Sequence, residues 1–333
     1  MNEEILTKTV ARLVSSPKGI LAIDESLPTC NKRFEKLGIP TTEEKRREYR
    51  ELLVTAPGIE KYISGYILFD ETIRQKTKKE ESFVSVLQSK GIEVGIKVDM
   101  GLADFPPLFG EKLTKGLEGL ENRLKEYRKM GATFTKWRAV YTIGENIPSE
   151  KCMKANAVLF AEYAKLCQKN DLVPIVEPEI LIDGSHTIEK CYEITARNLD
   201  IVFSELKKSG VFISCVILKT SMVISGKENS EKSSPGKIAQ MTLKCLKEHV
   251  SNDIGGIVFL SGGQEDKEAT ENLNAMHKTE KLPWSLTFSY SRAIQNEALK
   301  SWAKNPDDIK TAQTLLVAAA KNNSLASVGE YTK

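Results

Sequence analysis

Charge of one sign, long apolar segments and paired cysteines are all scarce in this sequence, and each shortage excludes a class of protein. Lysine and arginine together number 48 against 45 acidic residues, so the net charge is only +3. A nucleic-acid binder needs a clustered positive excess to neutralise phosphates. The longest apolar run, around residues 211–218, is far shorter than the roughly 20 residues that cross a bilayer. We therefore expect neither a nucleic-acid partner nor a membrane partner.

Cysteine and histidine are also used sparingly. The six cysteines form no Cys-x-x-Cys pair, which favours free thiols in a reducing compartment. Residues 1–16 include early acidic residues and no long apolar stretch, unlike a secretory signal, so we expect a cytoplasmic protein. The three histidines, His186, His249 and His277, lie far apart and none follows a predicted strand. No metal site is therefore predicted.

What the sequence does contain is a series of eight short apolar runs, nearly all ending in a charged or hydroxylated residue. They are 19–24, 63–70, 93–99, 134–140, 172–179, 215–222, 256–263 and 285–291. Helix-like stretches of mixed charge separate them, and strands that alternate with helices pair in parallel through crossovers. The pattern predicts an α/β protein, a (β/α)8 TIM barrel forming a single domain over residues 1–333. Such barrels carry their active site at the carboxyl ends of the strands.

The intervening helices are predicted from apolar spacing and from end signals. They are 3–15, 43–55, 117–130, 150–169, 187–208, 236–249, 267–278, 292–303 and 307–321. Gly131 is expected to end the third of these helices, and Asp308 to begin the last. The polar segment 225–237 could be an interdomain linker, but we interpret it as a loop because two further strands are needed to close the barrel.

Strand parity predicts which polar side chains share a face, because residues two apart point to the same side. The same-face pairs are Lys97 with Asp99, Lys136 with Arg138, and Glu177 with Glu179. Asp24 ends the first strand and Lys219 lies in the sixth. If these faces point inward, lysines and carboxylates converge at one mouth of the barrel.

Lys219 allows three interpretations, because a lysine in an apolar run is costly to bury alone. It could pair with Glu177 or Glu179, extend its amine to the rim, or act as a nucleophile. A nucleophilic amine must be partly neutral, and Lys136 or Lys97 could favour this as a nearby second cation. Glu177 is the first candidate for shuttling protons to a carbonyl substrate, followed by Glu179 and Asp24. A salt bridge from the two glutamates to Lys136 and Arg138 is the structural alternative.

Two segments have the character of phosphate sites. Ser261-Gly262-Gly263 ends the seventh strand, where glycines allow close backbone approach to an anion. Ser289-Tyr290-Ser291-Arg292 ends the eighth strand and supplies an arginine that can hold phosphate with two bonds. Barrels frequently bind phosphate between these two strands.

Six motifs resemble those of one known family. KGILAIDES, GIKVDMG, TKWRAVY, PIVEPEIL, VFLSGGQ and LTFSYSRA, in this order, resemble the class I fructose-1,6-bisphosphate aldolases from about residue 3 onward. The resemblance implies a (β/α)8 barrel that reversibly cleaves fructose 1,6-bisphosphate to dihydroxyacetone phosphate and glyceraldehyde 3-phosphate in glycolysis and gluconeogenesis. It implies a lyase that uses a lysine Schiff base, with no metal and no other cofactor. It also implies a homotetramer.

The resemblance assigns roles to residues at matching positions. It implies Lys219 as the Schiff-base lysine and Glu177 as the acid–base glutamate, with Glu179 beside it. Asp24 and Lys136 would assist cleavage of the carbon–carbon bond. The residues implied for the phosphate nearest the ketone are Ser261, Gly262, Ser291 and Arg292. Those implied for the distal phosphate are Ser26, Thr29, Arg33 and Lys97, and Arg138 would position the substrate.

The chain also departs from the family pattern. Leu27-Pro28-Thr29 stands where the family usually has Thr-Gly-Ser, and proline removes a backbone donor there. Thr220-Ser221 replaces the usual Pro-Asn. Ser291 replaces the glycine before the phosphate-binding arginine, and the backbone N–H of Ser291 could still bind phosphate if φ of Ser291 is negative. The family's mobile tail with a terminal tyrosine is expected to be absent, and Tyr331 is not assigned its role.

Two alternatives follow from these departures. A related metal-independent aldolase could prefer fructose 1-phosphate or another ketose phosphate. A non-enzymatic scaffold would be expected to lack a catalytic lysine or glutamate, whereas this chain has all of them.

Overall fold

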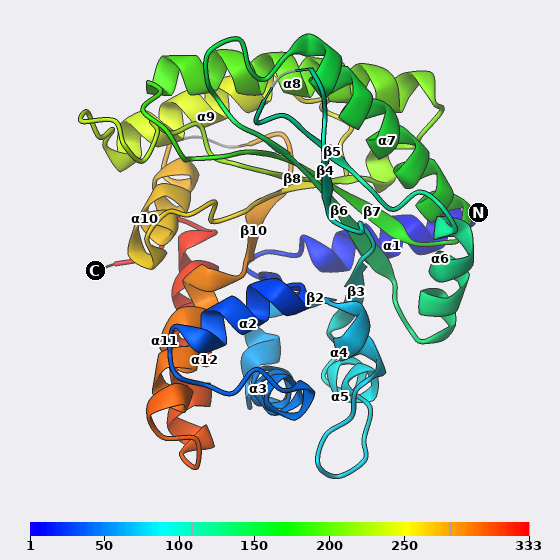
Figure 1. Cartoon of the computed structure of the whole chain (residues 1–333), viewed down its shortest axis with the longest axis vertical. Coiled ribbons are helices and arrows are strands. Elements are labelled where there is room, and N and C mark those ends of the chain that lie inside the picture. The colour runs from blue at the N-terminus through cyan, green and yellow to red at the C-terminus, as the bar shows by residue number, and fades with distance from the viewer. Residues whose placement is uncertain (108, 280–281, 333) are drawn as a thin grey trace.

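The computed structural model describes residues 1–107, 109–279 and 282–332, so Lys333 of the expected domain lies outside the described residues. Figure 1 shows strands running through the middle of the molecule with helices around them. Within the described residues, eight parallel strands close into a barrel in the order β1-β10-β9-β8-β7-β6-β3-β2. The predicted (β/α)8 barrel is therefore confirmed.

Every predicted strand region contains a barrel strand. The strands are β1 (Gly19–Ala22), β2 (Ile63–Leu68), β3 (Glu93–Lys97), β6 (Phe134–Tyr141), β7 (Val173–Ile180), β8 (Ile217–Thr220), β9 (Gly256–Phe259) and β10 (Leu286–Tyr290). Several end before the polar residues of the predicted runs. Asp24, Asp99 and Ser261 therefore lie in the loops directly beyond their strands, where a side chain can reach the barrel mouth.

The predicted helices are also present, with ends shifted by a few residues. They are α1 (Glu3–Leu13), α3 (Glu43–Thr55), α6 (Leu120–Lys129), α7 (Glu150–Lys169), α8 (Ile188–Lys208), α9 (Pro235–His249), α10 (Asp266–His277), α11 (Arg292–Lys304) and α12 (Ile309–Ala326). Gly131, with φ of 105°, follows the end of α6. Asp308 caps α12 by accepting from the Thr311 backbone N–H at 3.1 Å. Residues 225–234 contain no helix or strand, as expected of a loop.

Several short elements were not predicted. They are α2 (Leu27–Glu35), α4 (Asp70–Arg74), α5 (Phe83–Ser89), the 3-10 turns η1 (Ile59–Lys61) and η2 (Ile213–Cys215), and the antiparallel hairpin β4 (Leu102–Asp104) and β5 (Lys112–Thr114). Their brevity hides the apolar periodicity on which sequence-based prediction depends. The most consequential is α2, because it borders the mouth of the barrel.

Apolar packing closes the barrel at its amino-terminal end. Leu6, Val10 and Leu13 of α1 form one buried cluster with barrel-facing residues that include Phe134 and Val258. Phe134 fills the interior beside Gly95, where an added Cβ would lie 2.3 Å from the ring. Because this end is filled by side chains, the barrel interior can open into a pocket at its carboxyl-terminal rim. None of the described helices is long and apolar enough to span a bilayer.

Candidate active site

The carboxyl-terminal rim holds a cavity of about 430 Å³. All the site residues expected from the sequence line it: Asp24, Ser26, Thr29, Arg33, Lys97, Lys136, Arg138, Glu177, Glu179, Lys219, Ser261, Gly262, Ser291 and Arg292. They come from four barrel strands (β3, β6, β7 and β8), from the loops after β1 and β9, from α2 and from the start of α11. The barrel thus brings together residues that are as much as 268 positions apart in the chain.

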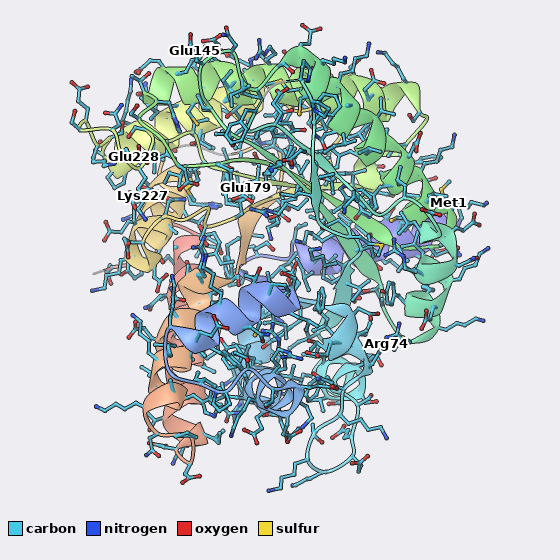
Figure 2. The ribbon with its side chains drawn as sticks, in the orientation of Figure 1. Met1, Arg74, Glu145, Glu179, Lys227 and Glu228 are labelled. Atoms are coloured by element: carbon cyan, nitrogen blue, oxygen red, sulfur yellow. The ribbon has the colours of Figure 1, made fainter. Side chains whose placement is uncertain are left out.

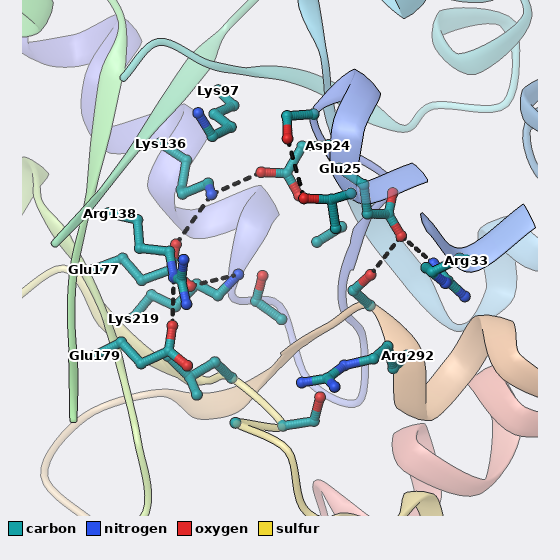
Figure 3. Close-up of a pocket in the computed structure, with 18 of the residues that line it drawn as sticks. Asp24, Glu25, Arg33, Lys97, Lys136, Arg138, Glu177, Glu179, Lys219 and Arg292 are labelled. Atoms are coloured by element: carbon teal, nitrogen blue, oxygen red, sulfur yellow. Dashed lines mark hydrogen bonds and ion pairs between the residues drawn. The ribbon is translucent and has the colours of Figure 1, made fainter. Parts of the chain in front are cut away.

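A chain of buried ion pairs crosses the floor of this pocket (Figure 3). Lys136 Nζ lies 2.7 Å from Asp24 Oδ2 and 3.2 Å from Glu177 Oε2. The other oxygen of Glu177, Oε1, lies 3.2 Å from Lys219 Nζ. Glu177 therefore lies between the two lysines, and the structural pairing considered for Lys219 does occur.

Strand register explains this arrangement. Arg138 on β6 pairs with Glu177 on β7, and Val176 on β7 pairs with Leu218 on β8. Glu177 and Lys219, one residue further along, are therefore level with each other and point to the same side. Asp24 reaches Lys136 across the barrel mouth from the end of β1.

The nearby lysines keep both carboxylates of this series of ion pairs, Asp24 and Glu177, ionised. Burial disfavours the charged form of Asp24, but Lys136, Lys219 and Lys97 outweigh it and lower its pKa from 3.8 to about 2. Burial likewise opposes ionisation of Glu177, and Lys136 and Lys219 again lower its pKa. The pKa of Lys136 is raised well above its ordinary value, because the carboxylates outweigh the cost of burial. Lys136 is thus a fixed positive charge.

The neighbouring ion pairs extend this network to the pocket walls. Arg138 Nε donates to Glu179 Oε2, and Glu179 raises the pKa of Arg138 against the opposing effect of burial. Lys97 Nζ donates to the carboxylate and, at 2.8 Å, to the backbone carbonyl of Asp99. The pairing of Glu179 with Arg138 matches the salt bridge foreseen from strand parity.

Arg33 has a more constrained environment than the sequence indicated. Its Nη1 donates to Glu25, and it reaches Gln295 Oε1 and Asn296 Oδ1 of α11 at 3.3 Å. Figure 3 places Arg33 on the same side of the pocket as Arg292, with Lys97 on the opposite side. The residues expected at the distal phosphate are therefore spread along the pocket.

The departures from the family pattern fit the local backbone. Pro28 lies in the first turn of α2, where a backbone N–H has no helical acceptor to lose. Ser291 has a negative φ, −111°, so this position does not require glycine. The backbone N–H of Ser291 therefore meets the condition stated above for binding phosphate. Its hydroxyl donates to Glu25 Oε1 at 3.0 Å. Gly262 and Gly263, by contrast, have φ of 56° and 86°, a region that favours glycine.

Three further lining residues received no role of their own in the sequence analysis, although Ser289 belongs to the segment at the end of the eighth strand that was expected to bind phosphate. Ser289 on β10 is buried, and its hydroxyl has no hydrogen-bond partner among the described residues. Its position two residues before Ser291 was the available signal, because parity places both on one face. Lys32 and Lys36 also line the pocket. They could have been found from their helical spacing with Thr29 and Arg33, had α2 been predicted.

Fold and site together define a class: a (β/α)8-barrel enzyme with buried amines beside carboxylates and a strongly cationic pocket. The family model for class-I fructose-bisphosphate aldolase, a glycolytic family, matches residues 5–333. The chain belongs to the class I fructose-bisphosphate aldolase family and is therefore an aldehyde-lyase. Within the described residues no group of three or more histidine, cysteine or acidic side chains could hold a metal ion.

Named relatives agree with this assignment. A probable fructose-bisphosphate aldolase class 1 of Xanthomonas axonopodis pv. citri is 50% identical over 332 residues, covering 99% of both chains. Cytosolic fructose-bisphosphate aldolase 4 of Arabidopsis thaliana is 47% identical over 96% of this chain and 82% of its own. Fructose-bisphosphate aldolase of Plasmodium falciparum, solved as a ternary complex with TRAP and a small-molecule inhibitor, superposes with a TM-score of 0.98. It is 43% identical, with 99% of this chain and 96% of that chain covered.

Proposed function

We propose that Lys219 attacks the ketone carbon of fructose 1,6-bisphosphate and forms a Schiff base there. The observation that carries this role is the ion-pair chain from Asp24 through Lys136 and Glu177 to Lys219. Glu177 is within hydrogen-bonding range of the Lys219 amine, so it can accept a proton during attack and return one when water leaves. The resulting iminium accepts electrons during bond cleavage.

Cleavage of the carbon–carbon bond requires a base at the hydroxyl on the aldehyde side. Asp24, ionised and buried, takes this proton, and the electron pair of the breaking bond moves into the iminium to give an enamine. Lys136, held positive between Asp24 and Glu177, stabilises charge that develops on the departing aldehyde oxygen. Protonation of the enamine at carbon and hydrolysis of the imine then release dihydroxyacetone phosphate. Each step conserves protons and electrons without an external oxidant.

The pocket walls would hold the two phosphates. The ketone-side phosphate is assigned to Ser261, Gly262, Ser291 and Arg292, where two left-handed glycines leave backbone N–H groups free to approach it. The distal phosphate is assigned to Ser26, Thr29, Arg33 and Lys97, and Arg138 with Glu179 positions the sugar between the two ends. No observation favours a fructose 1-phosphate enzyme over the bisphosphate enzyme.

Borohydride trapping with dihydroxyacetone phosphate tests the mechanism. The expected result is a reduced adduct on the peptide that contains Lys219, formed equally with EDTA present, since the proposed chemistry is metal-independent. A Lys219→Met protein is the matched control and should give no adduct. An adduct on another lysine, or cleavage that EDTA abolishes, would overturn the assignment.

We also infer a cytoplasmic homotetramer with one domain per chain. The family resemblance supports the oligomer, and the likeness to a cytosolic Arabidopsis aldolase supports the location. Light scattering on the purified chain tests the first, because a tetramer has four times the chain mass of 37.1 kDa. A monomer at micromolar concentration would contradict it.

A further inference from the structure

One face of α2 forms a polar stripe along the pocket. Thr29, Lys32, Arg33 and Lys36 follow the i, i+3, i+4, i+7 spacing of one helix face, and all four line the cavity. The opposite face carries Cys30 and Phe34, which are buried in the core. Packing of the apolar face therefore fixes which way the stripe points, and Lys36, just beyond the last turn, belongs to it.

The pocket cations differ in whether they have an acidic partner. Arg33, Lys97, Lys136, Arg138 and Lys219 each form an ion pair with a carboxylate. Lys32, Lys36 and Arg292 have no such pair among the described residues, and all three are exposed. The eight lysines and arginines of the lining face only four carboxylates. The partner of Lys97, Asp99, lies outside the lining, so among the described residues the cations of the lining without an acidic partner are these three.

The contacts of Arg33 indicate where the stripe lies relative to Arg292. Arg33, the stripe residue next to Lys32, contacts Gln295 and Asn296, which lie in the first turns of the helix that Arg292 begins. Figure 3 shows Arg33 and Arg292 on one side of the pocket and Lys97 and Lys136 on the other. The amino-terminal part of the stripe, Thr29, lies beside Ser26 of the proposed distal-phosphate set. Beyond Arg33 the stripe borders the first turns of α11, which begin with Arg292 of the proposed ketone-side set.

We propose that Lys36, together with Lys32, completes the binding site for the ketone-side phosphate of the substrate. This inference rests on the proposed function. A phosphate monoester carries about −1.5 to −2 charges at neutral pH, more than Arg292 alone can neutralise. The carboxyl-terminal end of α2 would repel an anion, and a lysine at that end offsets the helix dipole. A flexible ammonium group can contact phosphate as a point charge.

The condensation direction separates the two phosphates, because each substrate carries only one. Lys36→Gln is expected to raise the KM for dihydroxyacetone phosphate by about two- to fivefold, the range of an exposed ion pair. The KM for glyceraldehyde 3-phosphate and kcat should not change. The rise should shrink as salt is added, since exposed charges are screened. Lys36→Arg should restore the KM.

Two controls make the test specific. Lys154→Gln removes the same charge from an exposed position on α7 outside the pocket and should change neither KM. Lys97→Met, on the opposite side, should raise the KM for glyceraldehyde 3-phosphate. Equal KM values for Lys36→Gln and the parent protein, or a rise confined to glyceraldehyde 3-phosphate, would overturn the proposal. Borohydride trapping of Lys36→Gln at saturating dihydroxyacetone phosphate should still label Lys219, which keeps this outcome distinct from failure of the proposed function.

Discussion

Replacing Lys136 by methionine tests the energetic balance of the buried ion-pair chain. Lys136 is 4% exposed and is the cation nearest to Asp24, at 2.7 Å. Methionine has a similar stem and no charge, so the change removes the cation that pairs with both Asp24 and Glu177 and leaves Lys219 as the remaining lysine of the ion-pair series. Removing one partner of a buried pair typically costs about 3–5 kcal/mol, and we expect a loss of this size in the free energy of unfolding at neutral pH.

The pKa of Asp24 accounts for part of that loss. Because its folded-state pKa is lowered from 3.8 to about 2, its ionised form stabilises the fold above pH 3.8, and this contribution is lost as the pH falls through about 2. A shift of this size corresponds to about 2 kcal/mol. The remainder comes from Glu177, whose pKa is also lowered by Lys136.

The loss of unfolding free energy in the Lys136→Met protein should depend on pH. In the Lys136→Met protein burial is unchanged but the main counter-charge is gone, so the pKa of Asp24 rises above its ordinary value. Asp24 then takes up a proton as the pH is lowered, and the unpaired charge disappears. The difference in unfolding free energy between parent and variant should therefore be largest at neutral pH and smaller at about pH 5. Urea unfolding followed by circular dichroism, carried out on parent and variant at each of the two pH values, measures this difference.

A double variant provides the decisive comparison. In the double variant Asp24→Asn with Lys136→Met, the series of ion pairs contains one carboxylate, Glu177, and one lysine, Lys219, so its charges balance again. It should be more stable than Lys136→Met alone, since the buried excess negative charge has been removed. If the double variant is less stable than the single, or if Lys136→Met matches the parent protein at neutral pH, the charge-balance reasoning is wrong.

Three further predictions follow from individual side chains. Lys219→Met should lower the rate of fructose 1,6-bisphosphate cleavage at least about 10³-fold, because the nucleophile is lost; a rate within tenfold of the parent would contradict its role. Ser289→Ala should lower kcat/KM while leaving the urea midpoint unchanged, since the buried hydroxyl has no hydrogen-bond partner among the described residues to lose; unchanged kinetics would argue against substrate contact. Gly95→Ala should destabilise by about 1–3 kcal/mol through overpacking against Phe134. Gly236→Ala is the matched control, because the nearest described contact of a Cβ added at Gly236 is Ser234 Oγ, at 4.0 Å. Equal urea midpoints for these two variants would contradict the packing argument.

Much of the site could be predicted from local sequence, and some of it could not. Parity placed Lys136 with Arg138 and Glu177 with Glu179, and the position of each run within the strand order placed these residues at the rim. The stripe on α2 was missed because a helix of nine residues beginning with Leu-Pro has too few turns for its period to stand out. Ser289 was named within the predicted phosphate segment but given no role of its own, because the sequence gives no sign that its hydroxyl lacks a partner among the described residues.

The sequence by itself determined the fold class, the strand positions, the rim on which the polar residues gather and, through its motifs, the family. These features depend on the local alternation of apolar and polar residues and on motif identity. Only the tertiary structure decided that Glu177 lies between Lys136 and Lys219 and that Arg33 contacts α11. It also decided that Lys32, Lys36 and Arg292 have no acidic partner within the part of the chain that the structure describes. Parity fixes the side of a strand to which a residue points, whereas distances between residues on different strands depend on barrel closure and register. Those are properties of the whole chain.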